Sequence, residues 1–188
     1  GLINVVRTDH WIAAVATNWW AANQALDAMA PVFTTKGVMA DSGQIAQTLS
    51  DAIAKGPGVR LVSEGNVDAS LEKEAGTRVF KADYSVAAAV HAPIETRTAT
   101  ASWQNCRMQI WIASQAPESV RNAAAKATGI VLDEITVYPV FAGGSFDRNF
   151  DSLIAAQVAV IAMEVDRPVQ LVWSRPEDFM RDHVRSPA

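Results

Sequence analysis

The strongest constraint on the fold is a change of pattern after residue 77, where short β-branched runs begin to alternate with longer helical segments. The runs that read as strands are residues 78–82, 98–103, 108–113, 134–141 and 169–173. One helix is predicted from Pro117, a favoured first helical position, to Gly129, a natural C-terminal cap, and another over about 151–165. Strand pairs interleaved with single helices predict an α+β fold, with mixed sheets that carry helices on one face.

The first 76 residues predict a separate α+β segment, so we divide the chain into residues 1–76 and 77–188. Residues 2–6 and 11–16 read as a strand pair, and Asn18 can cap the helix that follows.

A second helix is predicted to begin after a cap at Asp41 or Ser42 and to end at residues 56–58. Its apolar positions recur every four residues and predict a face that packs against another element: Ile45, Leu49 and Ile53. Residues 59–62 then read as a short strand and residues 66–76 as a polar helical segment. The charges of this stretch, which include Lys73 and Glu74, are typical of a solvated face.

Gly143 and Gly144 lie between an apolar β-like run and an apolar helix. Glycine has no Cβ and tolerates positive φ, and a following helix offers unpaired N–H groups, so this pattern is compatible with a cradle for a phosphate or a pterin. The alternative is a turn that only joins a strand to a helix.

Composition argues against several other functions. The net charge of the 188 residues is −4, whereas binding of nucleic acid depends on clustered Lys and Arg. The apolar stretch 153–165 is shorter than the roughly 20 residues of a bilayer span, so no membrane span is predicted. Cys106 is the only cysteine and receives no role. The three histidines are isolated in sequence, so no metal site built from protein ligands is predicted.

Several stretches match one protein family in order. They are residues 91–95 (HAPIE), 98–101 (TATA), 111–117 (WIASQAP), 143–148 (GGSFDR) and 168–178 (PVQLVWSRPED). Together they resemble the molybdopterin-binding large subunit of the xanthine dehydrogenase and aldehyde oxidase family, in particular its isoquinoline 1-oxidoreductase beta-subunit or membrane-bound aldehyde dehydrogenase branch. Residues 15–22 (VATNWWAA) resemble the segment that precedes the molybdopterin domain there.

The resemblance implies a hammerhead-like segment over 1–76 and a molybdopterin-binding-like segment over 77–188. It also implies a molybdenum cofactor in a longer parent protein, with the rest of the large subunit and an iron-sulfur small subunit as partners. The family's catalytic glutamate lies beyond the matched region, so we expect no cofactor and no turnover in the isolated chain. A soluble protein on the periplasmic side of a bacterium is compatible with the resemblance.

The same resemblance implies the residues of the site. In the family, the glutamine that matches Gln115 donates a hydrogen bond to an oxygen ligand of molybdenum. The matching turn lies beside the cofactor and contributes mainly backbone amides, which here belong to Gly143, Gly144, Ser145, Phe146 and Asp147. Arg148 is either a partner for a pterin phosphate or a salt-bridge partner of Asp147 or Asp151.

Two positions depart from the family pattern, which has glycine where this chain has Ser145 and Asp147. Aspartate tolerates left-handed geometry, but its carboxylate repels an anionic cofactor unless Arg148 compensates. His91 and Glu95 are predicted to be structural, as are the charged residues at the start of the last helix, Arg175, Glu177 and Asp178.

The preferred interpretation is therefore part of a molybdenum hydroxylase that acts on an aldehyde or an N-heterocycle, with this chain supplying one wall of the molybdopterin site. The first alternative is a non-catalytic domain that keeps the fold for assembly or partner binding. The second is a general phosphate-binding module based on the glycine turn.

Overall fold

The computed structural model describes residues 1–37, 39–56, 58–72, 76 and 78–188. The chain divides into two compact units. The first unit contains Gly1–Thr34 and Val90–Val184, and the second contains Thr35–Ala89 and Arg185–Ala188. The boundary predicted between residues 76 and 77 stays a prediction, since Thr77 lies outside the described residues.

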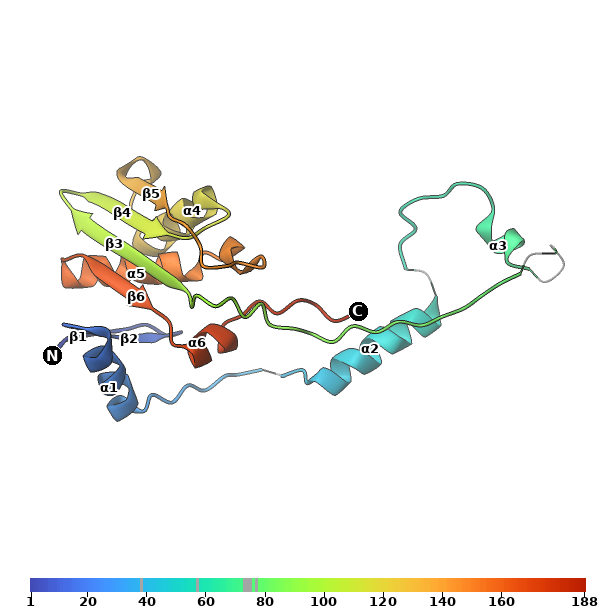
Figure 1. Cartoon of the computed structure of the whole chain (residues 1–188), viewed down its shortest axis with the longest axis horizontal. Coiled ribbons are helices and arrows are strands. Elements are labelled where there is room, and N and C mark those ends of the chain that lie inside the picture. Colours follow the sequence, from blue (N-terminus) through green and yellow to red (C-terminus); the bar gives the residue numbers. More distant parts are fainter. Residues whose placement is uncertain (38, 57, 73–75, 77) are drawn as a thin grey trace. The chain divides into compact units, whose positions relative to one another are not determined.

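A four-stranded mixed sheet is the centre of the first unit (Figure 1). Its strands are β3 (Thr98–Gln104), β4 (Arg107–Ile112), β5 (Ile135–Pro139) and β6 (Val169–Val172), in the order β5-β4-β3-β6. β3 pairs antiparallel with both β4 and β6, whereas β4 and β5 are parallel. The predicted α+β class with a mixed sheet is confirmed.

Two helices cover one face of this sheet: α4 (Pro117–Thr128) and α5 (Leu153–Val165). α4 provides the crossover that a parallel β4–β5 pair requires, and it ends at Gly129 with φ of 76°. The side chains that alternate toward the helices form the core, and those that are fully buried on β3 and β4 are Ala99, Ala101, Met108, Ile110 and Ile112. This confirms the prediction of helices on one sheet face.

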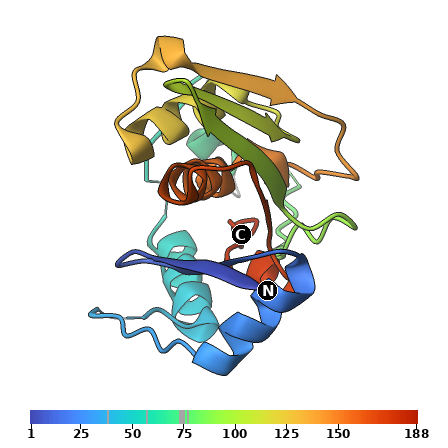
Figure 2. The same cartoon turned by 90° about the vertical axis from the view of Figure 1, so that its left-hand side faces the viewer.

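α5 is apolar over most of its circumference, and it is covered on two sides. One side packs on the four-stranded sheet. On the other lies a hairpin of β1 (Leu2–Arg7) and β2 (Ile12–Ala16), whose Val6, Ala13 and Val15 pack with Ile161 of α5 (Figure 2). The helix α1 (Trp19–Met29) follows the hairpin, and the Asn18 side chain caps it as predicted.

Three short helical segments complete the first unit. η2 (Leu132–Glu134) precedes β5, η3 (Arg148–Phe150) precedes α5, and α6 (Arg175–Met180) follows β6.

The second unit contains α2 (Ser42–Lys55) and the one-turn helix α3 (Val67–Ser70). α2 begins with a capping box formed by Asp41 and Gln44, and it ends at Gly56. Pro57, Lys73 and Glu74 lie outside the described residues.

The structure departs from the predictions for the second unit in several places. The strands predicted over 59–62 and 78–82 are wrong, since within the described part of the chain no segment supplies the ladder of backbone hydrogen bonds that a strand requires. Within the polar helical segment predicted over 66–76, the described residues form the one-turn helix α3. The apolar face of α2 is also not buried: Ile53 is 70% exposed. Among the described residues, no helix is long and apolar enough to cross a bilayer.

Candidate cofactor-binding site

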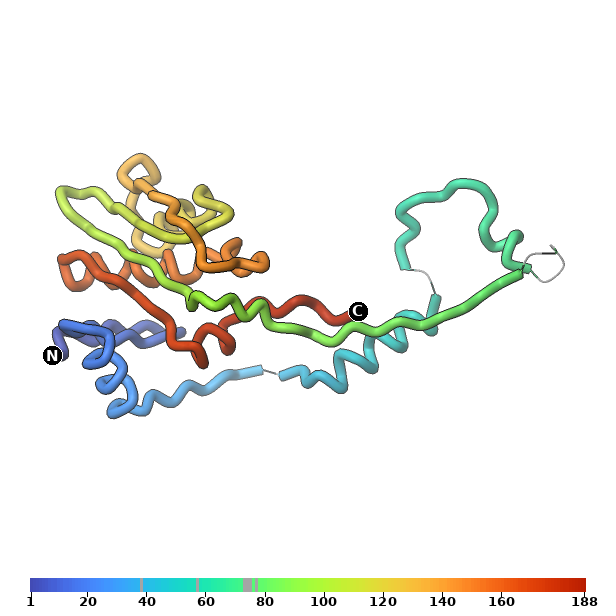
Figure 3. Tube along the Cα trace, in the orientation of Figure 1, coloured from blue at the N-terminus to red at the C-terminus, as the bar shows by residue number. Residues whose placement is uncertain are grey.

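The loop between β5 and α5 carries the predicted glycine turn, and Figure 3 traces it in orange. Gly144, Phe146 and Asp147 all have left-handed backbone, with φ of 94°, 51° and 76°. This region favours glycine, so the conformation of Asp147 explains why a glycine suits its position.

Position 143 requires glycine because Glu95 leaves no room for a Cβ there. The Gly143 N–H donates to the Glu95 carboxylate, and the Gly143 carbonyl accepts from the Glu95 N–H at 3.4 Å. A Cβ added at Gly143 would lie 2.8 Å from the Glu95 Cβ, which is closer than real Cβ contacts. Glu95 therefore holds the turn at Gly143, a structural role.

Arg175 fixes the segment that carries Glu95. Its guanidinium donates to the carbonyl oxygens of Pro93 at 2.7 Å and Ile94 at 2.6 Å. Arg175 stands at the first position of α6, which Ser174 caps through the N–H of Glu177. The start of α6 thus anchors Glu95, and through Glu95 it anchors the glycine turn.

Gln115 lies between β4 and α4 and meets the turn directly. Its side-chain oxygen accepts a hydrogen bond from the Ser145 hydroxyl. Its backbone N–H donates to the carbonyl of Asn149 at 3.1 Å, and the Ser145 oxygen accepts from the Asn149 N–H at 3.2 Å. Gln115 and the glycine turn, which are separated by about 30 residues in sequence, therefore form one surface.

The Gln115 amide nitrogen has no partner among the described residues, and the side chain is exposed. A neutral group with two unused N–H donors can bind an oxygen acceptor without acting as a competing metal ligand. The chemistry of this donor matches the role that the resemblance implies.

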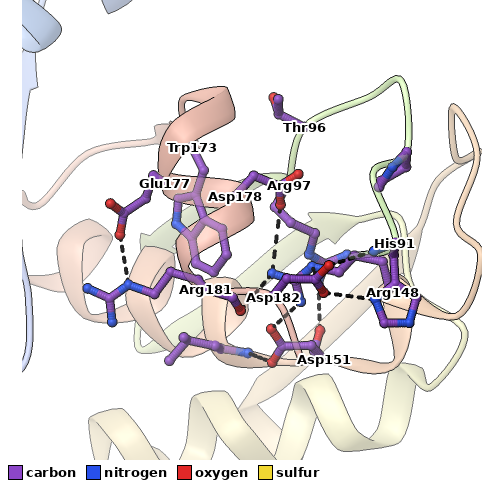
Figure 4. Close-up of polar contacts among 12 residues, drawn as sticks. His91, Thr96, Arg97, Arg148, Asp151, Trp173, Glu177, Asp178, Arg181 and Asp182 are labelled. Carbon is purple, nitrogen blue, oxygen red and sulfur yellow. Dashed lines mark hydrogen bonds and ion pairs between the residues drawn. The ribbon is translucent and has the colours of Figure 1, made fainter. Parts of the chain in front are cut away.

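Arg148 is buried, with only 2% of the residue exposed. Figure 4 shows the carboxylates and the tryptophan around it. Its guanidinium lies 2.8 Å from the Asp151 carboxylate, 3.2 Å from Asp182 and 3.7 Å from Asp178. It also lies over the ring of Trp173, at 5.6 Å from the centroid. The structure therefore shows the salt bridge to Asp151 that was one of the two alternatives for Arg148.

Asp182 links this ion-pair cluster to His91. It accepts from the backbone N–H of His91 at 2.7 Å, and one carboxylate oxygen lies 2.8 Å from His91 Nδ1 (Figure 4). Burial alone would raise the pKa of Asp182, but the two hydrogen bonds with His91 and the nearby Arg148 charge outweigh it, so the pKa is lowered. His91 is hydrogen-bonded, as its structural interpretation predicted.

The two other shifted groups of the cluster respond mainly to burial. Desolvation raises the pKa of Asp178, although Arg148 and Arg175 act in the opposite direction. Desolvation also lowers the pKa of Arg97, against the attraction of Asp151.

Sequence reasoning missed Arg97 and Asn149. The buried guanidinium of Arg97 donates to the Asn149 side-chain oxygen and to the backbone carbonyls of Ala113 and Asp151. It therefore ties the start of β3 to the end of β4 and to the loop before α5. The only signal in the sequence is a charged residue that directly precedes an otherwise uncharged strand.

A separate hollow of about 720 Å³ lies in the first unit, between β2, α1 and β6. Its lining includes Trp19, Trp173 and Glu177 but neither Gln115 nor any residue of the glycine turn.

Comparison with known proteins decides the family. The pattern of the molybdopterin cofactor-binding domain matches residues 51–188, which is most of the chain. The chain belongs to the molybdopterin cofactor-binding domain family. This confirms the resemblance, and the family implies a molybdenum cofactor in the proteins that contain this domain.

Curated relatives of this molybdopterin cofactor-binding domain are longer proteins. Isoquinoline 1-oxidoreductase subunit beta of Brevundimonas diminuta is 25% identical over 152 residues, which is 77% of this chain and 19% of that protein. Membrane-bound aldehyde dehydrogenase [pyrroloquinoline-quinone] of Gluconacetobacter polyoxogenes is 25% identical over 182 residues, 95% of this chain and 23% of that protein. The chain thus spans about a fifth of the length of these relatives.

Two solved structures resemble the domain. Aldehyde oxidoreductase from Desulfovibrio gigas aligns with a TM-score of 0.52 and 28% identity, over 55% of this chain and 12% of that one. Quinoline 2-oxidoreductase from Pseudomonas putida 86 aligns with a TM-score of 0.50 and 25% identity, over 55% of this chain and 14% of that one. Both support the α+β fold described above.

Proposed function

We propose that this chain forms one wall of the molybdopterin site in the large subunit of a molybdenum hydroxylase that acts on an aldehyde or an N-heterocycle. The observation that carries the proposal is the surface formed by Gln115 and the turn of residues 143–147. The names of the relatives, which oxidise aldehydes or N-heterocycles, support the substrate class.

The residues of this surface fit an anionic cofactor in two respects. The positive φ angles of Gly144, Phe146 and Asp147 vary the direction of successive backbone amides. Gln115 adds a side-chain donor that stays uncharged at every pH. When bound, the molybdenum cofactor supplies the oxidation chemistry.

The residues of this chain would bind and orient the cofactor. Gln115 donates from its amide nitrogen toward an oxygen acceptor of the cofactor. Glu95 and Ser145 hold the two sides of the turn, and Arg148 secures its C-terminal end through Asp151 and Asp182. A direct contact between Arg148 and a pterin phosphate stays a prediction that requires the guanidinium to leave these carboxylates.

The proposed partners are the rest of the large subunit and an iron-sulfur small subunit that accepts electrons. The word "subunit" in the name of the Brevundimonas diminuta relative supports a multi-subunit enzyme. The name of the Gluconacetobacter polyoxogenes relative supports a location at a membrane, with the periplasmic side following from the family resemblance.

Replacement of Gln115 by leucine in the full-length parent tests the role of the amide. Gln115→Leu keeps the approximate volume but removes the donor, so we expect kcat to fall about tenfold or more with molybdenum content retained. Gln104→Leu, at the exposed end of β3, is the matched control and is expected to change neither quantity. Unchanged kcat in a loaded Gln115→Leu enzyme would contradict the proposed role.

One observation favours the non-catalytic alternative: Asp147 is exposed, and its carboxylate has no side-chain partner among the described residues. Its charge lies on the surface where an anion would bind. Asp147→Gly in the parent distinguishes the cofactor-binding function from the non-catalytic one. If the molybdenum content of the wild type is low and Asp147→Gly raises it, the wild-type site is a degenerate cofactor site.

A further inference from the structure

Ser145 occupies a position that can set the orientation of Gln115. A side-chain amide has an acceptor end and a donor end, and a rotation of 180° exchanges them. Only one orientation presents N–H groups to an oxygen acceptor, whereas the other presents a carbonyl oxygen and repels it. The orientation of Gln115 therefore decides whether the amide can act as a donor.

The hydrogen bonds of Ser145 in the structure match the productive orientation. Its hydroxyl oxygen accepts from the Asn149 N–H at 3.2 Å, and the single hydroxyl hydrogen points to the Gln115 side-chain oxygen. With the oxygen held in this way, the amide nitrogen faces away from Ser145. The donor end is thus the end that stays available.

The frame around this contact is fixed at both ends. The backbone N–H of Gln115 donates to the Asn149 carbonyl at 3.1 Å. Asn149 is only 5% exposed, and its side-chain oxygen accepts from the buried Arg97. Ser145 and Gln115 are therefore both hydrogen-bonded to the buried Asn149, which keeps the hydroxyl and the amide close to each other.

We propose that Ser145 is a positioning residue that holds the Gln115 amide with its nitrogen directed toward the cofactor. This inference rests on the proposed function for its last step, the presence of the cofactor. A glycine at position 145 cannot supply this hydroxyl. In this chain, serine in place of glycine therefore provides a hydroxyl that fixes the orientation of the Gln115 amide.

The first test measures the order of the Gln115 side chain directly, by 15N relaxation of its amide group in the 188-residue chain. In the wild type, we expect the hydrogen-bonded amide to be ordered, with an order parameter above about 0.6. In Ser145→Ala and Ser145→Gly we expect it to fall below about 0.6, while Ser145→Thr, which retains the hydroxyl, restores it. Unchanged backbone spectra of the variants verify the fold.

The second test uses the molybdenum-loaded parent enzyme. Loss of one hydrogen bond changes the ratio of the two amide orientations by about fivefold. Because kcat follows the fraction of Gln115 in the productive orientation, Ser145→Ala should lower kcat by up to about fivefold with KM unchanged, and Ser145→Thr should retain the wild-type value.

An equally ordered Gln115 amide in Ser145→Ala would overturn the proposal, and so would a loaded Ser145→Ala parent with wild-type kcat. A Ser145-dependent order parameter in the 188-residue chain, combined with a parent that contains no molybdenum, would support the hydrogen bond but refute the proposed function. The orientation toward a cofactor would then be refuted with it.

Discussion

At the scale of single residues, the turn of residues 143–147 shows two separate reasons for glycine. Gly143 is needed because Glu95 occupies the space of a Cβ, while Gly144 is needed because its φ is 94°. Asp147 has a φ of 76° and bears the backbone strain that a glycine would avoid. The family resemblance of the sequence places glycines here, but only the structure separates the two causes.

Asp147→Gly is expected to raise the free energy of unfolding by about 0.5 kcal/mol, because glycine adopts left-handed backbone without strain. Denaturant unfolding followed by tryptophan fluorescence measures this change, since all six tryptophans lie in the first unit. The control Asp133→Gly, in the exposed helical turn η2, should instead lower stability by about 0.5 kcal/mol. Destabilisation by Asp147→Gly would show that the carboxylate, not the backbone, determines the preference at this position.

Gly143→Ala is expected to lower the free energy of unfolding by roughly 1–3 kcal/mol, because the new Cβ would overlap the Glu95 Cβ and carboxylate. A double-mutant cycle with Glu95→Gly identifies the cause, since this change removes both atoms that the methyl group would meet. In the Glu95→Gly background, Gly143→Ala should cost much less. An equal cost in both backgrounds would rule out the steric explanation.

At the scale of elements, the cluster around Arg148 connects segments that are far apart in sequence. Asp151 precedes α5, Asp178 belongs to α6, and Asp182 lies just beyond α6 and binds His91. These contacts hold the end of the glycine loop, α6 and the segment before β3 together. Sequence reasoning offered the Arg148–Asp151 pair as one alternative and gave Asp178 a structural role. It did not predict the cluster with Asp182, because pairing of residues far apart in sequence leaves no periodic signal.

Asp182→Asn is expected to lower the free energy of unfolding by about 3 kcal/mol at pH 7, because it leaves the buried Arg148 with one less charged partner. The pKa of Asp182 is lowered in the folded protein, so its stabilisation is complete above the ordinary aspartate pKa of about 3.9 and is lost as pH falls through the lower folded value. The difference between wild type and Asp182→Asn should therefore shrink between about pH 5 and pH 3.

Denaturant unfolding at several pH values measures this difference. The control Asp133→Asn changes a side chain that is 99% exposed and should alter stability by less than about 0.5 kcal/mol at each pH. A gap between wild type and Asp182→Asn that stays constant down to pH 3 would contradict the lowered pKa of Asp182.

At the scale of the whole molecule, the sequence predicted the first unit well and the second unit poorly. The strands, helices and caps of the sheet region follow from apolar alternation, Pro117, Gly129 and Asn18, each of which acts locally. Residues 59–62 and 78–82 have the composition of strands, yet no partner strand pairs with them. A strand is a property of two segments, so composition alone could not decide these two.

For the candidate site, the sequence predicted the residues that belong to motifs but not the contacts that support them. Gln115 and the glycine turn were identified from motifs, and the structure brings Gln115 and Ser145 together. The positions that support them were given general structural roles, as for Glu95 and Arg175, or were missed, as for Arg97. Support of this kind depends on the three-dimensional fold, which the motifs do not encode.

The central claim is that Gln115 and the turn of residues 143–147 form one wall of a site completed by other parts of a longer protein. Its most direct test is the analysis of molybdenum and pterin in the 188-residue chain and in its full-length parent, both produced in cells that make the cofactor. We predict molybdenum and pterin near one per molecule in the parent and neither in the isolated chain. Absence of both from the parent would contradict the claim and would show that the fold serves a non-catalytic role.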